Sequence, residues 1–440
     1  MGLFTARALF MLSAMFIVYA TSVPFDFSHA PTLAHAELIP FWDPVRGRLH
    51  SIPDIVQNVA LFLPYGFLAV RSVSGLRAGS AVRAVLLTAL LGLALSTAVE
   101  LIQTMSDLRQ TSATDLATNT FGAGAGALAA RVFGDHLSGR LHRLTVAMLR
   151  TQPGSVVLAL LALATFATLL APFVPSLDVG LLRAKVRALL DHPWGTKATG
   201  ALPFDVLLFL GTAFAASFEL PALLARGLGR DVRATPALVA AAIGAAGVSV
   251  WALVLESAQL PLVHHNPGLR EVVANVLGAI LGAGIALGLL GKSDARPGQS
   301  LGAWTRRWPA LVLAFAIAVP LVRALAPFEL APLDQALAKI DAGSFLPFWT
   351  LFRHLTFSTF TNVFEAACTY VPLGWALAVL GRRPAVIFAW ATGLAVALEL
   401  LQIPIAGRTF DPTEGILAAS GALAGAWLYQ RLVALTREIK

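Results

Sequence analysis

Long apolar runs recur along the whole of this chain and constrain its fold more than any other feature. Each run is about 18 residues or longer, enough to cross a bilayer as a helix. The composition agrees, because 57% of the 440 residues are hydrophobic and only 13% are charged. A soluble domain carries about twice that share of charged residues. The sequence therefore predicts an all-α, polytopic transmembrane helical bundle.

The runs number about twelve, and the loops between them alternate in character. Short basic loops alternate with longer loops rich in proline and aromatic residues. Lys and Arg are more numerous at the termini and in the even-numbered loops than in the odd-numbered loops. By the positive-inside rule we expect both termini in the cytoplasm. The spans are expected to start near residues 6, 55, 81, 113, 155, 203, 236, 270, 309, 360, 384 and 413.

The basic excess and the cysteine content exclude several classes of function. Loop Lys and Arg account for the net charge of +8 by fixing orientation, so no nucleic-acid partner is expected. Cys368 is the single cysteine, and neither CxxC nor His/Cys metal spacing occurs. We therefore expect no cofactor and no metal. The first apolar run resembles a signal peptide, but it is taken as a span because the same run and motif recur twice.

Shared motifs predict three tandem four-helix repeats with limits 1–150, 151–305 and 306–440. A Pro-Phe pair follows spans one, five and nine, and a Pro-aromatic pair comes later in the same loops. Spans three, seven and eleven each end in a Glu-x-x-Gln motif. The motif residues are Glu100 and Gln103, Glu256 and Gln259, and Glu399 and Gln402.

An acid opens the span that follows each Glu-x-x-Gln motif. Asparagine comes four residues later in two repeats, and two glycines follow at helical spacing. Residues at these intervals share one helix face, and a Gly-x-x-x-Gly pair lets two backbones approach closely. The acids are Asp115, Glu271 and Glu414. The asparagines are Asn119 and Asn275, with Ala418 as the departure, and the glycine pairs begin at Gly122, Gly278 and Gly421.

Proline lies within spans two and ten, at Pro64 and Pro372. Proline removes a backbone hydrogen bond and kinks a helix. A carbonyl freed near a polar cluster can line a cavity. We place Ala215 at the matching position of the middle repeat.

The motifs predict one polar cluster per repeat, at the outer membrane boundary. Glu-x-x-Gln puts a carboxyl and an amide on one helix face. The next acid lies across a short loop, and the bases there are Arg109, Arg408 and, at an offset position in the middle repeat, Arg270. Such residues mark function in a membrane, but they also bond helices together, and for single residues both interpretations stay open. For the combined set we predict ligand-binding pockets formed by Glu100, Gln103, Arg109, Asp115, Asn119, Glu256, Gln259, Glu271, Asn275, Glu399, Gln402, Arg408, Asp411 and Glu414.

These motifs resemble the VanZ-like family. The resemblance is carried in the first repeat by Pro24 to Phe27, Gln57 to Phe67, the Glu100 motif and Arg109 to Gly122, and in the third by the Glu399 motif and Arg408 to Gly421. It implies a multi-pass protein of the bacterial inner membrane that is linked to the cell envelope. Because the founding member lowers sensitivity to a glycopeptide, it also implies a connection with antibiotic resistance. It supplies no agreed catalytic residue.

Three classes of function fit the sequence. The first is binding of an amphiphile, such as a lipid headgroup or a lipid-linked glycan, in addition to the lipid bilayer itself. The second is transport of a lipid or small amphiphile. The third is an enzyme with Glu399 or Glu100 as general base, which we rank last because no nucleophile–His pair, HExxH motif or phosphatase-like set is present. The sequence leaves the oligomeric state unspecified.

Overall fold

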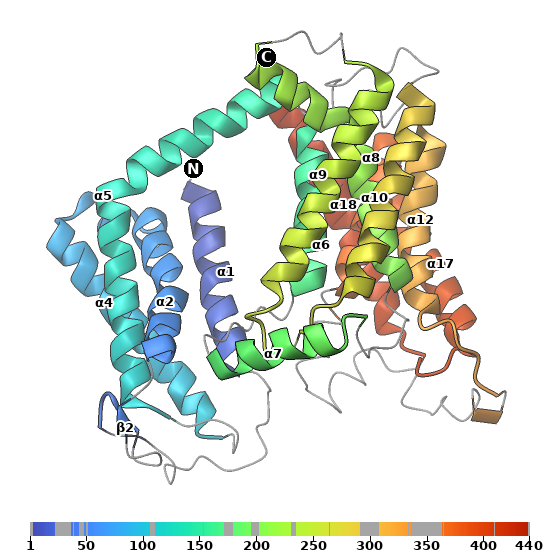
Figure 1. The fold of residues 1–440 in the computed structure, drawn as a ribbon. Helices are drawn as coiled ribbons and strands as arrows, with labels where there is room; N and C mark the ends of the chain where they lie inside the picture. The colour runs from blue at the N-terminus through green and yellow to red at the C-terminus, as the bar shows by residue number, and fades with distance from the viewer. Residues whose placement is uncertain are drawn as a thin grey trace. The chain divides into compact units, whose positions relative to one another are not determined.

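The computed structural model of the chain is built almost wholly from helices (Figure 1). The strands among the described residues are β1 (Trp42–Asp43) and β2 (Arg48–Leu49), which pair antiparallel. The structure describes residues 3–22, 37, 39–43, 48–49, 52–105, 111–152, 154–170, 179–194, 202–229, 235–263, 265–290, 308–332, 334–335, 363, 365–408 and 410–438.

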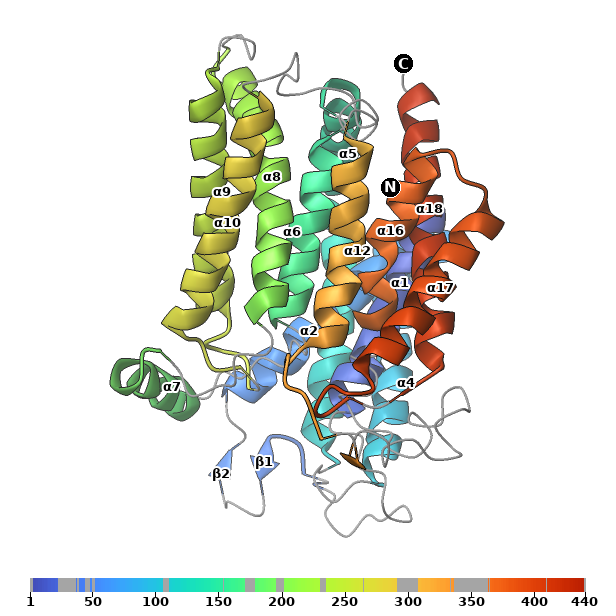
Figure 2. The same ribbon diagram turned by 90° about the vertical axis from the view of Figure 1, so that its right-hand side faces the viewer.

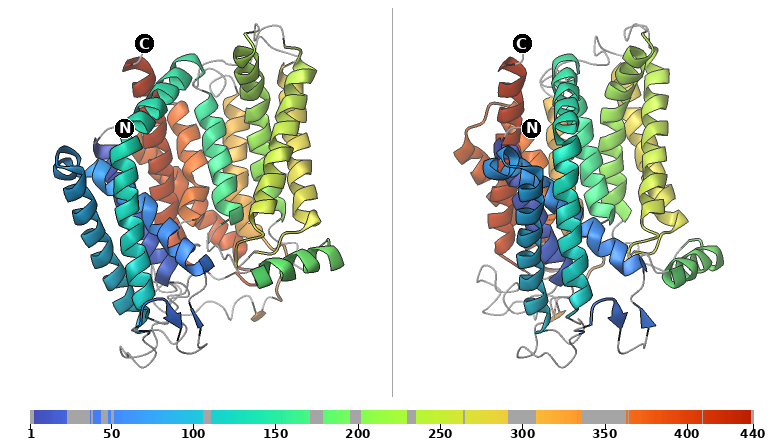
Figure 3. Two further views of the ribbon diagram at one scale, coloured as in Figure 1. Left: turned by 60° about the vertical axis from the view of Figure 1, so that its left-hand side comes forward. Right: turned by 90° about the vertical axis from the view of Figure 1, so that its left-hand side faces the viewer.

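The chain divides into two compact units, which are described separately. The first contains Met1–Thr145, together with the short stretches Pro172–Arg183 and Pro261–His264. Its helices α1, α2 and α4 pack against one another (Figure 3). The helices of this unit are α1 (Leu3–Ser22), α2 (Ile52–Ser72), α3 (Ser74–Ala78), α4 (Ala81–Gln103) and most of α5 (Ala113–Thr151).

The second unit contains the remaining residues. Its helices α8, α9 and α10 run side by side and contact one another, and α12 packs against α8, α16 and α17 (Figure 2). The helices that follow α5 are α6 (Ser155–Leu170), α7 (Val179–Asp191), α8 (Leu202–Gly227), α9 (Ala237–Ala258), α10 (Leu269–Leu290), α12 (Pro309–Leu325), α16 (Val371–Val379), α17 (Pro384–Gln402) and α18 (Thr413–Glu438).

Six helices are long and apolar enough to cross a membrane, among the residues that the structure describes. They are Ile55–Ser72, Ala81–Gln103, Leu202–Gly227, Ala237–Ala258, Leu269–Leu290 and Pro384–Gln402. Three further apolar helices are shorter: Leu9–Val18, Ser155–Leu170 and Pro309–Leu325. The chain is therefore a multi-pass helical membrane protein, while the count of about twelve spans stays a prediction.

Glycines bring pairs of helices into backbone contact, as the Gly-x-x-x-Gly spacing predicted. A Cβ on Gly122 of α5 would lie 2.6 Å from the Val59 carbonyl oxygen of α2. A Cβ on Gly278 of α10 would overlap the Val206 carbonyl of α8. One on Gly421 of α18 would overlap the Ala367 carbonyl just before α16. The second glycines, Gly126, Gly282 and Gly425, meet Leu63, Leu210 and Val371 in the same way.

These contacts fix the register between the three helix pairs and correct one assignment. Because Leu63, Leu210 and Val371 occupy equivalent places, so do the residues that follow them. The middle counterpart of Pro64 and Pro372 is therefore Gly211, and the assignment of Ala215 was wrong. The absence of a side chain at Gly211 lets the ring of Phe315 from α12 approach it. Helix α2 continues through Pro64, whereas Pro372 lies in the first turn of α16.

Alanine dominates the core where α12, α16, α17 and α18 meet. The buried members include Ala316 of α12, Ala391 and Ala395 of α17, and Ala418 and Ala422 of α18. In a membrane, lipid tails are as apolar as leucine, so helices associate through close packing of small residues rather than through burial from water. This explains why the helix faces are rich in alanine and glycine.

Candidate functional site

The glutamates of the three Glu-x-x-Gln motifs make the same contact in each predicted repeat. Glu100, Glu256 and Glu399 are buried at the ends of α4, α9 and α17. Each carboxylate accepts a hydrogen bond from the backbone N–H twelve residues later, just before the next helix. The donors and distances are Ser112 at 2.8 Å, Gly268 at 2.8 Å and Asp411 at 2.7 Å.

This contact satisfies one backbone N–H near the start of α5, α10 and α18, where the helix itself provides no acceptor. A carboxylate is also favoured beside a helix N-terminus by the helix dipole. The repeated glutamate therefore fixes the short loop that joins two helices. That is a structural role for one carboxylate oxygen of each glutamate.

Two of the three motif glutamines, Gln103 and Gln259, bond to the first helix of their repeat. Gln103 Nε2 donates to the Thr21 carbonyl at the end of α1, at 2.9 Å. Gln259 Nε2 donates to the Leu169 carbonyl at the end of α6, at 3.1 Å. Carbonyls in the last turn of a helix lack an internal partner, so both glutamines cap a helix.

Arg408 takes over this capping role in the predicted third repeat. Its Nε donates to the Ala326 carbonyl at 2.8 Å, and a terminal nitrogen donates to the Arg323 carbonyl at the end of α12. Gln402 is buried as well, and its side-chain amide acts on the Glu399 carboxyl. Burial, together with the neighbouring charge of Arg323, lowers the pKa of the Arg408 guanidinium below its ordinary value. Arg109, the corresponding base of the first repeat, lies outside the described residues.

The acids that open the fourth helices have three different surroundings. Asp115 Oδ1 accepts a hydrogen bond from Asn58 Nδ2 of α2, at 2.6 Å. Glu414 forms an ion pair with Arg323 of α12, at 3.2 Å. Glu271 folds back over Gly268, where a Cβ would overlap its Oε2. The absence of a side chain at Gly268 thus makes room for this carboxylate.

Sequence reasoning missed Asn58 and Arg323 as members of the polar clusters. Asn58 was visible as an amide inside an apolar span, within the stretch that carries the family resemblance. Arg323 was visible as a single charge near the end of an apolar run, four residues before Pro327. The residues four before the other two Pro-Phe pairs are Ala20 and Thr168, so this charge is particular to the third repeat.

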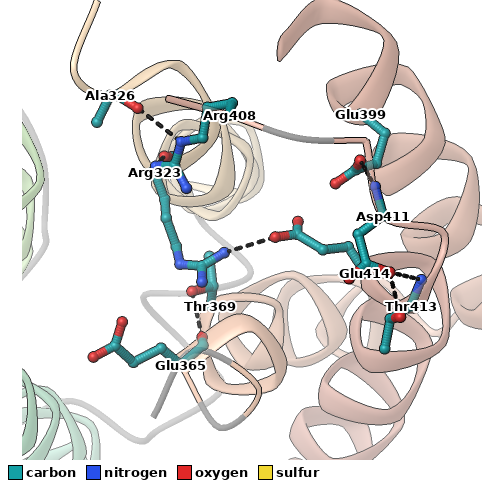
Figure 4. Close-up of polar contacts among 9 residues, drawn as sticks. All are labelled: Arg323, Ala326, Glu365, Thr369, Glu399, Arg408, Asp411, Thr413 and Glu414. Atoms are coloured by element: carbon teal, nitrogen blue, oxygen red, sulfur yellow. Dashed lines mark hydrogen bonds and ion pairs between the residues drawn. The ribbon is translucent and has the colours of Figure 1, made fainter. Parts of the chain in front are cut away.

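The third repeat gathers several charged side chains in one place (Figure 4). We call Arg323, Glu399, Arg408, Asp411 and Glu414 the third-repeat cluster. Asp411 Oδ1 accepts hydrogen bonds from the backbone N–H of Thr413, at 2.9 Å, and from its hydroxyl. The cluster contains three carboxyl groups and two guanidinium groups. Figure 4 shows the Glu365 carboxyl pointing away from them.

The asparagine position pairs with a serine only in the first repeat. Asn119 Nδ2 donates to Ser96 Oγ at 2.9 Å. Both partners are alanine in the third repeat, Ala418 and Ala395, and both are buried there. The middle repeat has Asn275 with Ala252 in place of the serine. Asn275 is 1% exposed, and neither its amide nitrogen nor its oxygen has a hydrogen-bond partner.

Substituting Ala252 with serine should therefore stabilise the protein. The new hydroxyl would occupy the place of Ser96 and satisfy the Asn275 amide, adding about 0.5–1.5 kcal/mol to the free energy of unfolding. The matched control is Ala395→Ser, where the neighbouring Ala418 offers no partner and the variant should gain nothing. Thermal unfolding in detergent measures both. Equal effects of the two substitutions would contradict the pairing.

Comparison with known proteins identifies the family but gives no closer relative. No curated protein matches the chain, and no solved structure matches it. The family model described as VanZ/LLP1 matches residues 7–134 and 310–434. The two matched regions contain the Glu100 and Glu399 motifs, and the Glu256 motif lies between them. Together these regions make up more than half of the sequence, and the chain therefore belongs to the VanZ/LLP1 family.

Proposed function

We propose that this membrane protein binds the polar headgroup of a cell-envelope amphiphile, a lipid or a lipid-linked glycan. The third-repeat cluster is the principal site. In this proposal the protein lies in the bacterial inner membrane with both termini in the cytoplasm, and the three polar clusters face outward. The middle segment, 151–305, is a divergent third copy of the four-helix unit, which the shared glutamate and glycine contacts support.

The observation that carries the proposal is the second carboxylate oxygen of Glu399. This side chain is only 2% exposed. Its Oε2 accepts the hydrogen bond from Asp411, but its Oε1 is buried without a partner. A buried polar atom without a partner costs free energy of about 1–3 kcal/mol. A ligand that donates a hydrogen bond to Oε1 would remove this cost.

The charges of the cluster indicate which headgroup fits. Arg408 is engaged with the carbonyls at the end of α12, and Arg323 is paired with Glu414. The oxygen without a partner belongs to an acid, so the ligand must present a donor. We therefore propose a headgroup with a hydroxyl or ammonium group that contacts Glu399, such as a sugar, glycerol or ethanolamine group.

The variant Glu399→Gln tests this proposal. It preserves the side-chain volume and one oxygen for Asp411, but it replaces the other oxygen with an NH₂ group that cannot accept a hydrogen bond. We expect the variant to fold and to lose at least about tenfold of its affinity, which corresponds to one charged hydrogen bond of about 1.5 kcal/mol. The measurement is mass spectrometry of envelope lipids and lipid-linked glycans that copurify with the protein.

Glu365→Gln is the matched control, because it changes another glutamate that points away from the cluster. It should retain the same molecules as the wild type. Equal retention by Glu399→Gln and the wild type, at equal protein levels, would contradict the proposal. If the bound molecule takes part in envelope assembly, cells that carry Glu399→Gln should also show the envelope-drug sensitivity of cells that lack the protein.

A further inference from the structure

A second buried polar site lies in α8, away from the repeated motifs. Glu219 is 1% exposed and Gln152, just before α6, is 0% exposed. Gln152 Nε2 donates to Glu219 Oε2 at 2.7 Å and to the Glu219 backbone carbonyl at 2.6 Å. Gly154 lies against the same carboxyl, since a Cβ there would overlap Glu219 Oε1. The glycine lets the acid approach the chain at this point.

This site is remote from the Glu256 and Glu271 cluster of the same helices. Glu219 lies about 25 Å along α8 from Leu202, at 1.5 Å per residue. The contacts of Val206 with Gly278 and of Leu210 with Gly282 show that α8 and α10 run in the same direction. Glu219 therefore lies toward the C-terminal end of α10, whereas Glu271 lies in its first turn.

The contact between Glu219 and Gln152 lacks one hydrogen-bond donor. Both donors of the Gln152 amide are used, but Gln152 Oε1 has no partner, and neither does Glu219 Oε1. Two buried acceptor oxygens therefore have no hydrogen-bond donor. A carboxylic acid carries one O–H donor that a carboxylate lacks. A proton on Glu219 supplies the missing donor and removes a buried negative charge, whose cost without a cation is several kcal/mol.

The described cations of the helices around Glu219 lie away from its carboxyl. Helices α6, α9, α10 and α12 pack against α8. Their described charged residues are Glu256, Arg270, Glu271 and Arg323, and all four lie toward the other ends of those helices. On α8 itself, Asp205 lies in the first turn. Arg226 acts on Glu219 electrostatically from about two turns away and is itself exposed.

We propose that Glu219 and Gln152 form a proton-binding site within the membrane-embedded part of the protein. At neutral pH Glu219 is a neutral carboxylic acid paired with the Gln152 amide. Release of its proton to water leaves a carboxylate with no donor for Gln152 Oε1, and this weakens the contact between the start of α6 and α8. Titratable groups inside spanning helices are typical of proton pathways, so the site adds a property that headgroup binding does not require.

Infrared difference spectroscopy of the full chain in lipid nanodiscs tests the proposal. The wild type at neutral pH should show a C=O stretch of a protonated carboxyl that disappears at alkaline pH. Glu219→Gln should lack this component, and Asp205→Asn, which changes another acid of the same helix, should retain it. A wild-type spectrum without a Glu219-dependent component would overturn the proposal.

If Glu219→Gln does not fold, a second variant still tests the proposal. Gln152→Leu retains the acid but removes its amide partner, so the carboxyl band should shift to higher frequency rather than vanish. An unshifted band would contradict the pairing.

The pH dependence of the free energy of unfolding is an independent test of whether Glu219 carries this proton. The folded chain holds a proton that the unfolded chain has released at neutral pH, so wild-type stability should fall as the pH rises, until Glu219 ionises. The unfolding equilibrium constant should change by about tenfold per pH unit in this range. Glu219→Gln cannot titrate and should lack this part of the pH dependence. Identical profiles of the two proteins would count against the site.

Discussion

Replacing Gly421 with valine is expected to prevent α18 from packing against α16. A Cβ at this position would overlap the Ala367 carbonyl oxygen and approach its carbonyl carbon to 2.8 Å. Overpacking of a core typically costs about 1–3 kcal/mol. Here the atom that would have to move belongs to the backbone, and a rotamer change cannot relieve the overlap. We therefore expect a loss of at least about 3 kcal/mol in the free energy of unfolding.

Gly393 provides a matched control within the same group of helices. It lies in α17, and a Cβ there would meet nothing within 4 Å. Gly393→Val should therefore fold like the wild type. Thermal unfolding and size-exclusion chromatography in detergent would compare the two variants. A Gly421→Val protein as stable as Gly393→Val would show that the close helix contact does not exist.

The second large effect is expected at the ion pair between Arg323 and Glu414. Their side chains are 15% and 21% exposed, and their nitrogen and oxygen atoms lie 3.2 Å apart. Arg323→Met or Glu414→Gln alone would leave one charge without this partner in a mostly buried position. Breaking a fully buried pair costs about 3–5 kcal/mol, so partial exposure reduces our expectation to about 2–3 kcal/mol.

The double variant Arg323→Met/Glu414→Gln should recover most of this loss. It contains neither charge, and replacing both members of a buried pair is often neutral. The difference between the double variant and the sum of the single variants gives the interaction energy. Arg382→Met is the control, because Arg382 is an exposed cation of the loop before α17 and its loss should change stability by less than about 0.5 kcal/mol. Additive single effects would show that the pair is not coupled.

This cycle also separates structure from binding in the third-repeat cluster. The headgroup proposal assigns the donor contact to Glu399, and the ion pair belongs to two other side chains. A double variant that is stable but no longer retains the amphiphile would place Arg323 or Glu414 among the groups that contact the ligand. A stable variant that retains it would exclude Arg323 and Glu414 from the groups that contact the ligand.

The sequence named polar residues of the third-repeat cluster, but it did not show which groups they contact. Glu399 and Glu414 were identified as acids that flank one short loop, and the structure places both in one cluster. The glutamines were expected to face a pocket beside the glutamates. Gln103 and Gln259 instead cap α1 and α6, because the carbonyls at those helix ends need donors.

The sequence by itself determined the membrane class, the glycine-mediated contacts and the recurrence of a buried glutamate. These features follow from composition and from short-range spacing, since residues three and four apart share a helix face wherever that helix is placed. The spacing of Gly421 and Gly425 predicts a close helix contact without showing which helix makes it. The same local pattern carried the family resemblance in the first and third repeats.

Only the tertiary structure decided which polar groups meet. Gln103 finds its carbonyl 82 residues away, Gln152 meets Glu219 across 67 residues, and Arg323 meets Glu414 across 91 residues. No short-range pattern encodes such pairs, because each depends on the register that glycine and alanine contacts set between helices. In an apolar medium a buried polar group can bond only to the partners that this register places within reach. The register between the helices therefore decides which partner each polar residue of an apolar run meets. The resulting contacts are helix caps, an ion pair and an acid–amide pair.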